Sequence, residues 1–275
     1  MIKVFVDSGS SIKPHEKEKY GVEILPLKIL MKDKEYLDGI DLNVDDFYDM
    51  LINEKIFPKT SLPSMLETEE KVKSYVEKGY DVIIVSISSG ISGTYNMLRN
   101  MFENESKVHV IDSKIAVGGI RLIVDEINRN KDLPVEEILA KVEELIPRIR
   151  VAAVPETLEY LYRGGRLSKI SFVVGSLLKI KPIISFKDGL VKVYQKAIGL
   201  GNAMKAIISM LSKCDENHKI IPSYTYDDKN LDVLISGMEE KHKKLLDVKD
   251  NLDLAIASHW GPNAFGFIFV EKASI

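Results

Sequence analysis

The stretch VIIVSISSGISGTYNML, residues 82–98, joins two patterns that together indicate the fold. Residues 82–85 are all β-branched and show no alternation with polar residues, which is typical of a strand buried on both faces of a parallel sheet. The stretch also supplies four serines, two glycines and one threonine before apolar residues return at helical spacing. A strand, a hydroxyl-rich turn and a helix in this order predict one βα unit of an α/β protein.

Apolar runs and helical periodicities extend this pattern along the whole chain. In the first half they predict strands at 2–8, 22–31 and 107–112, and helices beginning near Asn43, Ser64, Val117 and Val135. In the second half they predict strands at 148–154, 219–226, 252–258 and 264–270, helices at 168–180, 202–212 and 228–246, and a hairpin at 181–197 that turns at Asp188-Gly189. We therefore predict an α/β protein of two α/β domains. Residues 1–150 would hold a parallel or mostly parallel sheet, and residues 151–275 a mixed sheet.

The composition argues against several classes of protein. The chain has 275 residues and a formal net charge of −3, so it lacks the basic excess of a general nucleic-acid binder. One cysteine, Cys214, allows no intrachain disulfide, and the five histidines show no paired ligand spacing, so we expect no metal site. The N-terminus lacks the pattern of a signal peptide, and no window holds the ~20 apolar residues of a membrane helix. We expect a cytoplasmic protein with no stable membrane insertion.

Polar residues follow three of the predicted strands: Asp7 and Ser8, Ser88 and Ser89, and Ser258 and His259. In open α/β sheets the ligand lies at the carboxyl ends of the strands, so this placement favours a binding site there. The SSGISGT loop, residues 88–94, also precedes a helix, and free backbone amides at a helix start attract an anion. The loop has neither the lysine of a phosphate-binding P-loop nor a G-x-G-x-x-G pattern, which favours a carboxylate over a phosphate.

Other interpretations of the same residues stay open. Ser89 or Ser92, His259 and Asp7 would form the triad of a serine hydrolase or acyltransferase, although GISG is not the G-x-S-x-G turn of such enzymes. A histidine at a strand end is often only structural. Arg166 follows the Gly164-Gly165 pair, where it would be free to contact an anion. It would equally suit an ordinary surface arginine after a helix.

Seven segments taken in order resemble the DegV family of bacterial fatty-acid-binding proteins. They are DS (7–8), KTSLPS (59–64), SSGISGTY (88–95), IDSK (111–114), LEYLYRGGRLS (158–168), LLKIKPIISFKDG (177–189) and HWGPNAFG (259–266). The resemblance spans essentially the whole chain. It implies two α/β domains with a fatty acid buried between them.

The resemblance also implies a function and a set of residues. Members of the family are non-enzymatic lipid-carrying subunits of fatty acid kinase, with no cofactor. They present the bound acid to a separate ATP-dependent kinase protein, with at most transient membrane contact. The implied carboxylate-binding positions in this chain are Thr60, Ser61, Ser89, Ser92, His259 and Arg166. Candidates to surround the tail are Phe172, Val173, Leu177, Ile183, Phe265 and Phe267, each of which also suits an ordinary core.

Overall fold

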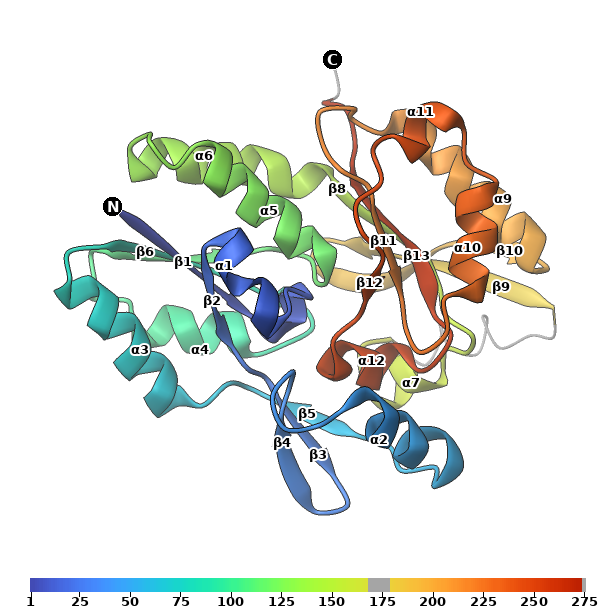
Figure 1. Cartoon of the computed structure of the whole chain (residues 1–275), viewed down its shortest axis with the longest axis horizontal. Helices are drawn as coiled ribbons and strands as arrows, with labels where there is room; N and C mark the ends of the chain where they lie inside the picture. Colours follow the sequence, from blue (N-terminus) through green and yellow to red (C-terminus); the bar gives the residue numbers. More distant parts are fainter. Residues whose placement is uncertain (168–178, 274–275) are drawn as a thin grey trace. The chain divides into compact units, whose positions relative to one another are not determined.

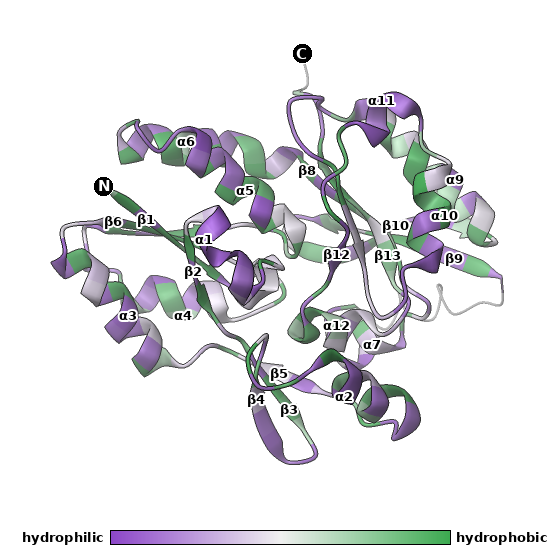
Figure 2. Ribbon diagram, viewed as in Figure 1, coloured by the Kyte–Doolittle hydropathy of each residue, from purple (hydrophilic) through white to green (hydrophobic). Residues whose placement is uncertain are grey.

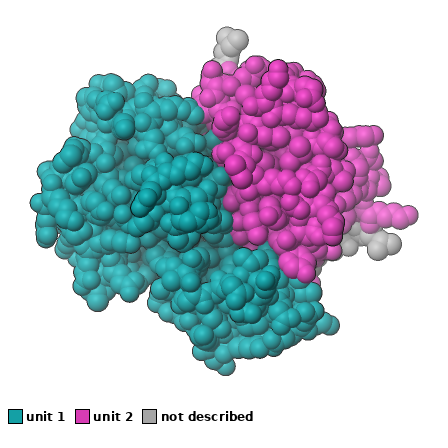
Figure 3. Space-filling model, viewed as in Figure 1, with its two compact units in different colours: residues 1–147, 253–255 teal, residues 148–252, 256–275 magenta. Residues whose placement is uncertain are grey.

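The computed structural model describes residues 1–167 and 179–273, traced along the chain in Figure 1. These residues form two compact units, coloured separately in Figure 3. Unit 1 comprises residues 1–147 and 253–255, and unit 2 comprises residues 148–252 and 256–275. The chain therefore leaves unit 2 after Leu252, passes through unit 1 for three residues, and re-enters unit 2 at Ile256.

Unit 1 is built on a four-stranded sheet in the order β2-β1-β6-β7, with every pair parallel. Its strands are β1 (Ile2–Asp7), β2 (Val22–Leu25), β6 (Asp81–Ser86) and β7 (Val108–Asp112). Five of the six residues of β6 are buried, as expected of a central strand without hydrophobic alternation. The prediction of a parallel sheet in the N-terminal half is confirmed.

Helices cover both faces of this sheet. Phe5, Val82 and Ile84 point to one face, where they pack with Val72 of α3 and Leu98 of α4. Figure 1 shows α5 and α6 on the opposite face, and Figure 2 shows polar and apolar residues mixed along these helices, as in amphipathic helices. The helical segments of unit 1 are η1 (Ser8–Ser10), η2 (Pro14–Glu16), α1 (Lys17–Tyr20), α2 (Val44–Tyr48), η3 (Asp49–Asn53), α3 (Met65–Glu77), α4 (Thr94–Met101), α5 (Gly118–Arg129), α6 (Val135–Leu145) and η4 (Ile146–Arg148), whose last residue begins unit 2.

A small antiparallel sheet in unit 1 was not predicted. It has the order β4-β3-β5, formed by β3 (Lys28–Met31), β4 (Lys34–Leu37) and β5 (Lys59–Ser61). No strand was predicted just before the helix that begins near Ser64, but residues 59–61 pair with β3. The short length of β5 explains the error, since three residues give too little periodicity to read.

Unit 2 is built on a six-stranded sheet in the order β10-β9-β8-β13-β11-β12. The strands are β8 (Ile149–Val154), β9 (Ile180–Lys187), β10 (Leu190–Ile198), β11 (Ile221–Tyr224), β12 (Asp250–Asn251) and β13 (Phe265–Val270). Only β11 and β12 pair in parallel, which confirms the prediction of a mixed sheet. The β9–β10 hairpin turns at Asp188 and Gly189, and both have positive φ, as a two-residue turn of type I′ requires.

One face of this sheet carries the core of unit 2. Ile183, Phe265 and Phe267 are buried there with residues of α9 and α10. They are therefore packed core, whereas Phe172, Val173 and Leu177 lie outside the described residues. The helical segments of unit 2 are α7 (Glu159–Arg163), α9 (Leu200–Met210), η5 (Leu211–Lys213), α10 (Lys229–Ser236), α11 (Glu240–Lys243) and most of α12 (Leu254–Trp260), whose first two residues lie in unit 1.

Three predicted elements in this half were wrong in detail. Residues 254–260 form helix α12, where a strand was expected at 252–258. A short apolar run is compatible with a buried strand or a buried helix, and periodicity cannot separate the two. The helix expected at 228–246 is two shorter helices, and Ile180 begins a strand instead of ending a helix. Residues 168–178, most of the helix expected at 168–180, lie outside the described residues.

Candidate functional site

The carboxyl ends of β1 and β6 are joined by Asp7. Its Oδ2 accepts hydrogen bonds from the Ile87 amide (2.7 Å) and the Ser86 hydroxyl (3.3 Å), and its Oδ1 accepts one from the Gly9 amide (3.0 Å). Asp7 is fully buried, and this burial raises its pKa to about 6 against the opposing effect of these three donors. Both oxygens are thus engaged in holding the strand ends together, which counts against Asp7 as the acid of a hydrolase triad.

The loop after β6 is a compact turn centred on Ser88. The Ser88 carbonyl accepts hydrogen bonds from the Ile91 and Ser92 amides, both at 3.1 Å, and its hydroxyl oxygen accepts one from Gly90 at 3.2 Å. Ser88 is fully buried, whereas Ser89 and Ser92 are only partly buried. Ser88 therefore shapes the loop, and the two predicted site serines are the ones with exposed surface.

Ser92 forms a hydroxyl pair with Thr94 at the start of α4. The Ser92 Oγ accepts a hydrogen bond from the Thr94 amide at 3.3 Å and lies 2.8 Å from the Thr94 Oγ1. This arrangement satisfies one amide of the first turn, which an isolated helix would leave without a partner. Thr94 ends the SSGISGT segment but was not predicted as a site residue, because its position in the first turn also suits a purely structural role.

A cation lies beside Ser89, supplied by the segment after β7. The Lys114 ammonium donates to the Asp112 Oδ2 at 2.6 Å and to the Ser89 Oγ at 3.3 Å, while the Ser89 amide donates to the Asp112 Oδ1 at 3.0 Å. Burial alone would raise the pKa of Asp112, but the hydrogen bonds from Lys114 and Ser89 outweigh it and lower that pKa. Asp112 and Lys114 both belong to the IDSK segment (111–114), and neither of them was predicted as a site residue.

Thr60 and Ser61 lie on β5, next to the same loop. They pair with Ile29 and Lys28 of β3, and Thr60 is partly buried whereas Ser61 is exposed. The following Leu62 packs on the glycine that precedes α4: a Cβ added at Gly93 would lie 3.6 Å from the Leu62 Cδ2. The structure thus brings the KTSLPS and SSGISGT segments together within unit 1.

A surface groove of about 450 Å³ includes Pro63 and Ser64 of the KTSLPS segment. Its lining residues come from the end of β2 and the start of α3, and are Ile24, Leu25, Pro26, Pro63, Ser64, Glu67, Thr68, Glu70 and Lys71. None of the predicted site residues lines it. Two glutamates against one lysine, Lys71, also make it an unfavourable site for an anionic headgroup.

His259 lies in the last turn of α12 in unit 2, and not at a strand end as predicted. Its ring packs on Gly164: an added Cβ at that glycine would lie 2.2 Å from the His259 Nδ1. A reciprocal contact lies close by, where an added Cβ at Gly261 would be 2.2 Å from the Tyr160 Cδ2. The RGG segment and the His-x-Gly-Pro turn are therefore in direct contact, and each requires a glycine for the close approach.

Arg166 extends from the same junction. Its guanidinium donates to the Gly164 carbonyl, and burial lowers the pKa of Arg166. His259 is partly exposed, but desolvation of its ring, with the nearby positive charge of Arg166, lowers the pKa of His259 to about 3. Unit 2 thus brings the two predicted residues His259 and Arg166 together, as unit 1 does for Thr60, Ser61, Ser89 and Ser92.

This environment predicts that the imidazole of His259 stays neutral from about pH 5 to pH 8, although an ordinary histidine titrates in that window. The folded state then excludes a proton that the unfolded chain binds below the ordinary pKa of 6.5. His259 should therefore lower the stability of the fold as the pH falls below that value. Proton NMR of the ring should show no titration in this window, with His259→Gln used for assignment. A midpoint near 6.5 would contradict the structure.

The described residues contain neither a membrane-spanning helix nor a cluster of metal-binding side chains. Over 1–167 and 179–273, no helix has the length and apolar character needed to cross a bilayer. Within the same ranges, no three side chains of the His, Cys, Asp and Glu types are grouped as they would be around a metal ion.

The sequence and the fold are similar to those of known proteins. The family model described as "Uncharacterised protein, DegV family" matches residues 1–272. A DegV domain-containing protein from Clostridium acetobutylicum is 34% identical over 98% of this chain and 99% of its own length. The crystal structure of a stearic acid-binding protein from Eubacterium ventriosum matches with a TM-score of 0.88 and 27% identity, covering 99% of both chains. A fatty-acid-binding DegV family protein from Thermus thermophilus matches with a TM-score of 0.85 and 26% identity, over 98% of this chain and 99% of that one. The chain belongs to the DegV family.

Proposed function

We propose that this protein binds a long-chain fatty acid and presents it to a separate ATP-dependent kinase that phosphorylates the carboxylate. The observation that carries the binding proposal is the likeness, over 99% of both chains, to the stearic acid-binding protein from Eubacterium ventriosum. The proposed carboxylate-binding residues are Thr60, Ser61, Ser89 and Ser92 in unit 1, and His259 and Arg166 in unit 2. No independent catalysis is proposed for this chain.

The chemistry of the residues supports a carboxylate ligand. A carboxylate removed from water needs hydrogen bonds to replace those it loses. Lys114 donates to the Ser89 Oγ, so the Ser89 hydroxyl proton is directed toward another acceptor. Neutral His259 can donate one ring N–H, and Arg166 adds a guanidinium. Each buried methylene of the tail would contribute ~0.8 kcal/mol, which is offset in part by the cost of association.

Mass spectrometry of the protein purified from a bacterial host tests the binding proposal. Denaturing extraction is expected to release a free long-chain fatty acid in near-stoichiometric amount. An acyl group covalently attached to Ser89 or Ser92, or hydrolysis of an ester that Ser→Ala abolishes, would instead identify a serine hydrolase or acyltransferase.

Ser92→Ala is expected to weaken fatty-acid binding by roughly tenfold, because losing one hydrogen bond to a desolvated charge costs about 1–3 kcal/mol. The measurement is displacement of a fluorescent fatty acid from delipidated protein. Ser74→Ala is the matched control, since the Ser74 hydroxyl donates only to the Lys71 carbonyl on an exposed part of α3. Equal affinity in wild type and Ser92→Ala would remove Ser92 from the proposed site.

The kinase part of the proposal has its own test. Loaded protein mixed with a purified fatty acid kinase and ATP is expected to yield acyl phosphate, trapped as the hydroxamate. The fatty-acid carboxylate attacks the γ-phosphorus of ATP, and ADP leaves. The kinase must be shown to be active on its own lipid carrier. If it then forms no acyl phosphate with this protein, the partnership is refuted and the binding proposal stands.

A further inference from the structure

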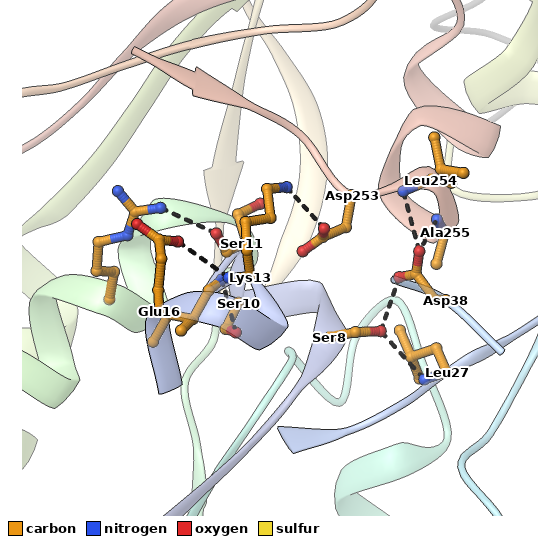
Figure 4. A network of polar contacts seen from close by, with 12 residues as sticks. Ser8, Ser10, Ser11, Lys13, Glu16, Leu27, Asp38, Asp253, Leu254 and Ala255 are labelled. Carbon is orange, nitrogen blue, oxygen red and sulfur yellow. Dashed lines mark hydrogen bonds and ion pairs between the residues drawn. The ribbon is translucent and has the colours of Figure 1, made fainter. Parts of the chain in front are cut away.

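The start of α12 is held by a buried carboxylate from a distant part of unit 1. Figure 4 shows Asp38 facing the first two residues of the helix. The Asp38 Oδ1 accepts hydrogen bonds from the Leu254 amide at 3.0 Å and the Ala255 amide at 3.2 Å. The Asp38 Oδ2 accepts one from the Ser8 hydroxyl at 2.7 Å, and Ser8 in turn accepts from the Leu27 amide at 3.1 Å. Asp38 is only 2% exposed, so its carboxylate is fully engaged inside the protein.

An ion pair holds the residue immediately before the helix. The Lys13 ammonium lies 2.6 Å from the Asp253 Oδ1, and the side chains are 23% and 7% exposed. The Lys13 segment is itself fixed, because the Lys13 amide donates to the Glu16 Oε2 at 3.0 Å. Burial raises the pKa of Asp253 to about 7 and that of Asp38 to about 6, and Lys13 opposes the shift at both. Lys13 therefore favours the ionised form of both carboxylates, against the effect of burial.

Both contacts act on the end of α12 where a helix most needs partners. The first amides of any helix have no acceptor within it, and a negative charge there also interacts favourably with the helix dipole. Asp38 supplies both the acceptor and the charge. The helix is only seven residues long, and His259 lies five residues after Leu254, or about 7.5 Å along the axis. Fixing the first turn of so short a helix also fixes the turn that carries His259.

We propose that Asp38 and Lys13 are positioning residues for His259, because they fix the first turn of α12, the short helix that carries the imidazole. Neither residue is proposed to touch the ligand, since Asp38 is buried and Lys13 is committed to Asp253. The predicted effect on fatty-acid affinity rests on the proposed function. The effect on the His259 ring does not depend on it.

The variants are Asp38→Asn, which keeps the shape and removes the charge, and Lys13→Met, which keeps the length and removes the ammonium. Two matched controls are available in unit 1. Asp41→Asn changes an exposed carboxylate that accepts from the Leu37 amide, and Lys32→Met breaks an exposed ion pair with Glu54. The readouts are ¹⁵N-histidine NMR of delipidated protein and the dissociation constant of a fluorescent fatty acid.

In both variants the His259 ring signals are expected to shift and to titrate nearer neutral pH, while those of the described His109, His218 and His242 stay in place. The fatty-acid dissociation constant should rise roughly threefold to tenfold, and neither control should change either readout. Unchanged His259 signals in both variants would overturn the proposal.

Two further outcomes remain interpretable. If Asp38→Asn loses the spread of all histidine signals, it has unfolded, and Lys13→Met decides the question because Lys13 lies at the edge of the network. If wild-type protein binds no fatty acid, the proposed function fails, and the NMR comparison still tests the positioning of His259.

Discussion

Gly164→Ala is expected to displace His259 and to weaken fatty-acid binding by at least about tenfold, which corresponds to ~1.4 kcal/mol. The added Cβ would lie 2.2 Å from the His259 Nδ1, 2.9 Å from its Cε1 and 3.0 Å from the Tyr160 carbonyl oxygen. No unstrained alanine fits at these distances, so the ring has to move. Overpacking of this kind also costs about 1–3 kcal/mol of stability.

The His259 ring reports this displacement directly. Its pKa is held at about 3 by burial and by Arg166, so a displaced ring that meets water should titrate nearer its ordinary value of 6.5. Proton NMR of Gly164→Ala should therefore show a titrating His259 signal that wild type lacks. The same samples give the fatty-acid dissociation constant.

Gly165→Ala is the matched control for this experiment. A Cβ there would meet nothing within 4 Å, but Gly165 has a φ of +75°, so the substitution carries backbone strain without a steric clash. It should lower stability by ~1 kcal/mol and leave the His259 titration unchanged. If Gly164→Ala and Gly165→Ala have the same effect on the ring, the contact between Gly164 and His259 is not what places it.

Gly266→Ala is expected to lower the free energy of unfolding by about 3 kcal/mol or more, at or above the upper end of the usual range of about 1–3 kcal/mol for overpacking. Gly266 lies in β13 opposite Ala153 of β8. An added Cβ would lie 2.2 Å from the Ala152 carbonyl oxygen and 2.6 Å from the Ala153 Cα. These are backbone atoms of a paired strand, so the clash can be relieved only by separating β8 from β13.

Urea denaturation followed by circular dichroism measures this loss. Gly201→Ala in α9 is the control, because nothing lies within 4 Å of its added Cβ. It should stabilise the protein by ~0.5–1 kcal/mol, as replacing a helical glycine by alanine usually does. A midpoint for Gly266→Ala equal to that of wild type would show that β8 and β13 lie farther apart than in this structure.

The strands and turns of the main sheets were predictable because their signals are local. The β-branched run at 82–85 needs burial on both faces. β6 meets this need because it lies between β1 and β7 in a sheet that has helices on both faces. Asp188 and Gly189 tolerate positive φ, and the β9–β10 hairpin turns there. Ser64 and Asn43 carry side chains that cap helices, and both do so. In each case the determining residues lie within a few positions of one another.

The features that depend on distant residues were not predictable in the same way. Residues 254–260 are an apolar run whose helical state is supported by Asp38, more than 200 positions earlier in the chain. Lys114 reaches Ser89 only because β6 and β7 are neighbours in the sheet. The approach of His259 to Gly164 likewise joins two segments that no local pattern connects.

The amino-acid sequence thus determined the α/β class, the parallel and mixed sheets, and which residues form the hydroxyl-rich loop. It did so because hydrophobic periodicity and turn chemistry act over a few residues. The three-dimensional packing decided which side chains surround Ser89 and His259 and whether residues 254–260 are helix or strand. The reason is that a short apolar segment is stable in either state, and the choice falls to hydrogen bonds and close contacts with residues far away in the chain.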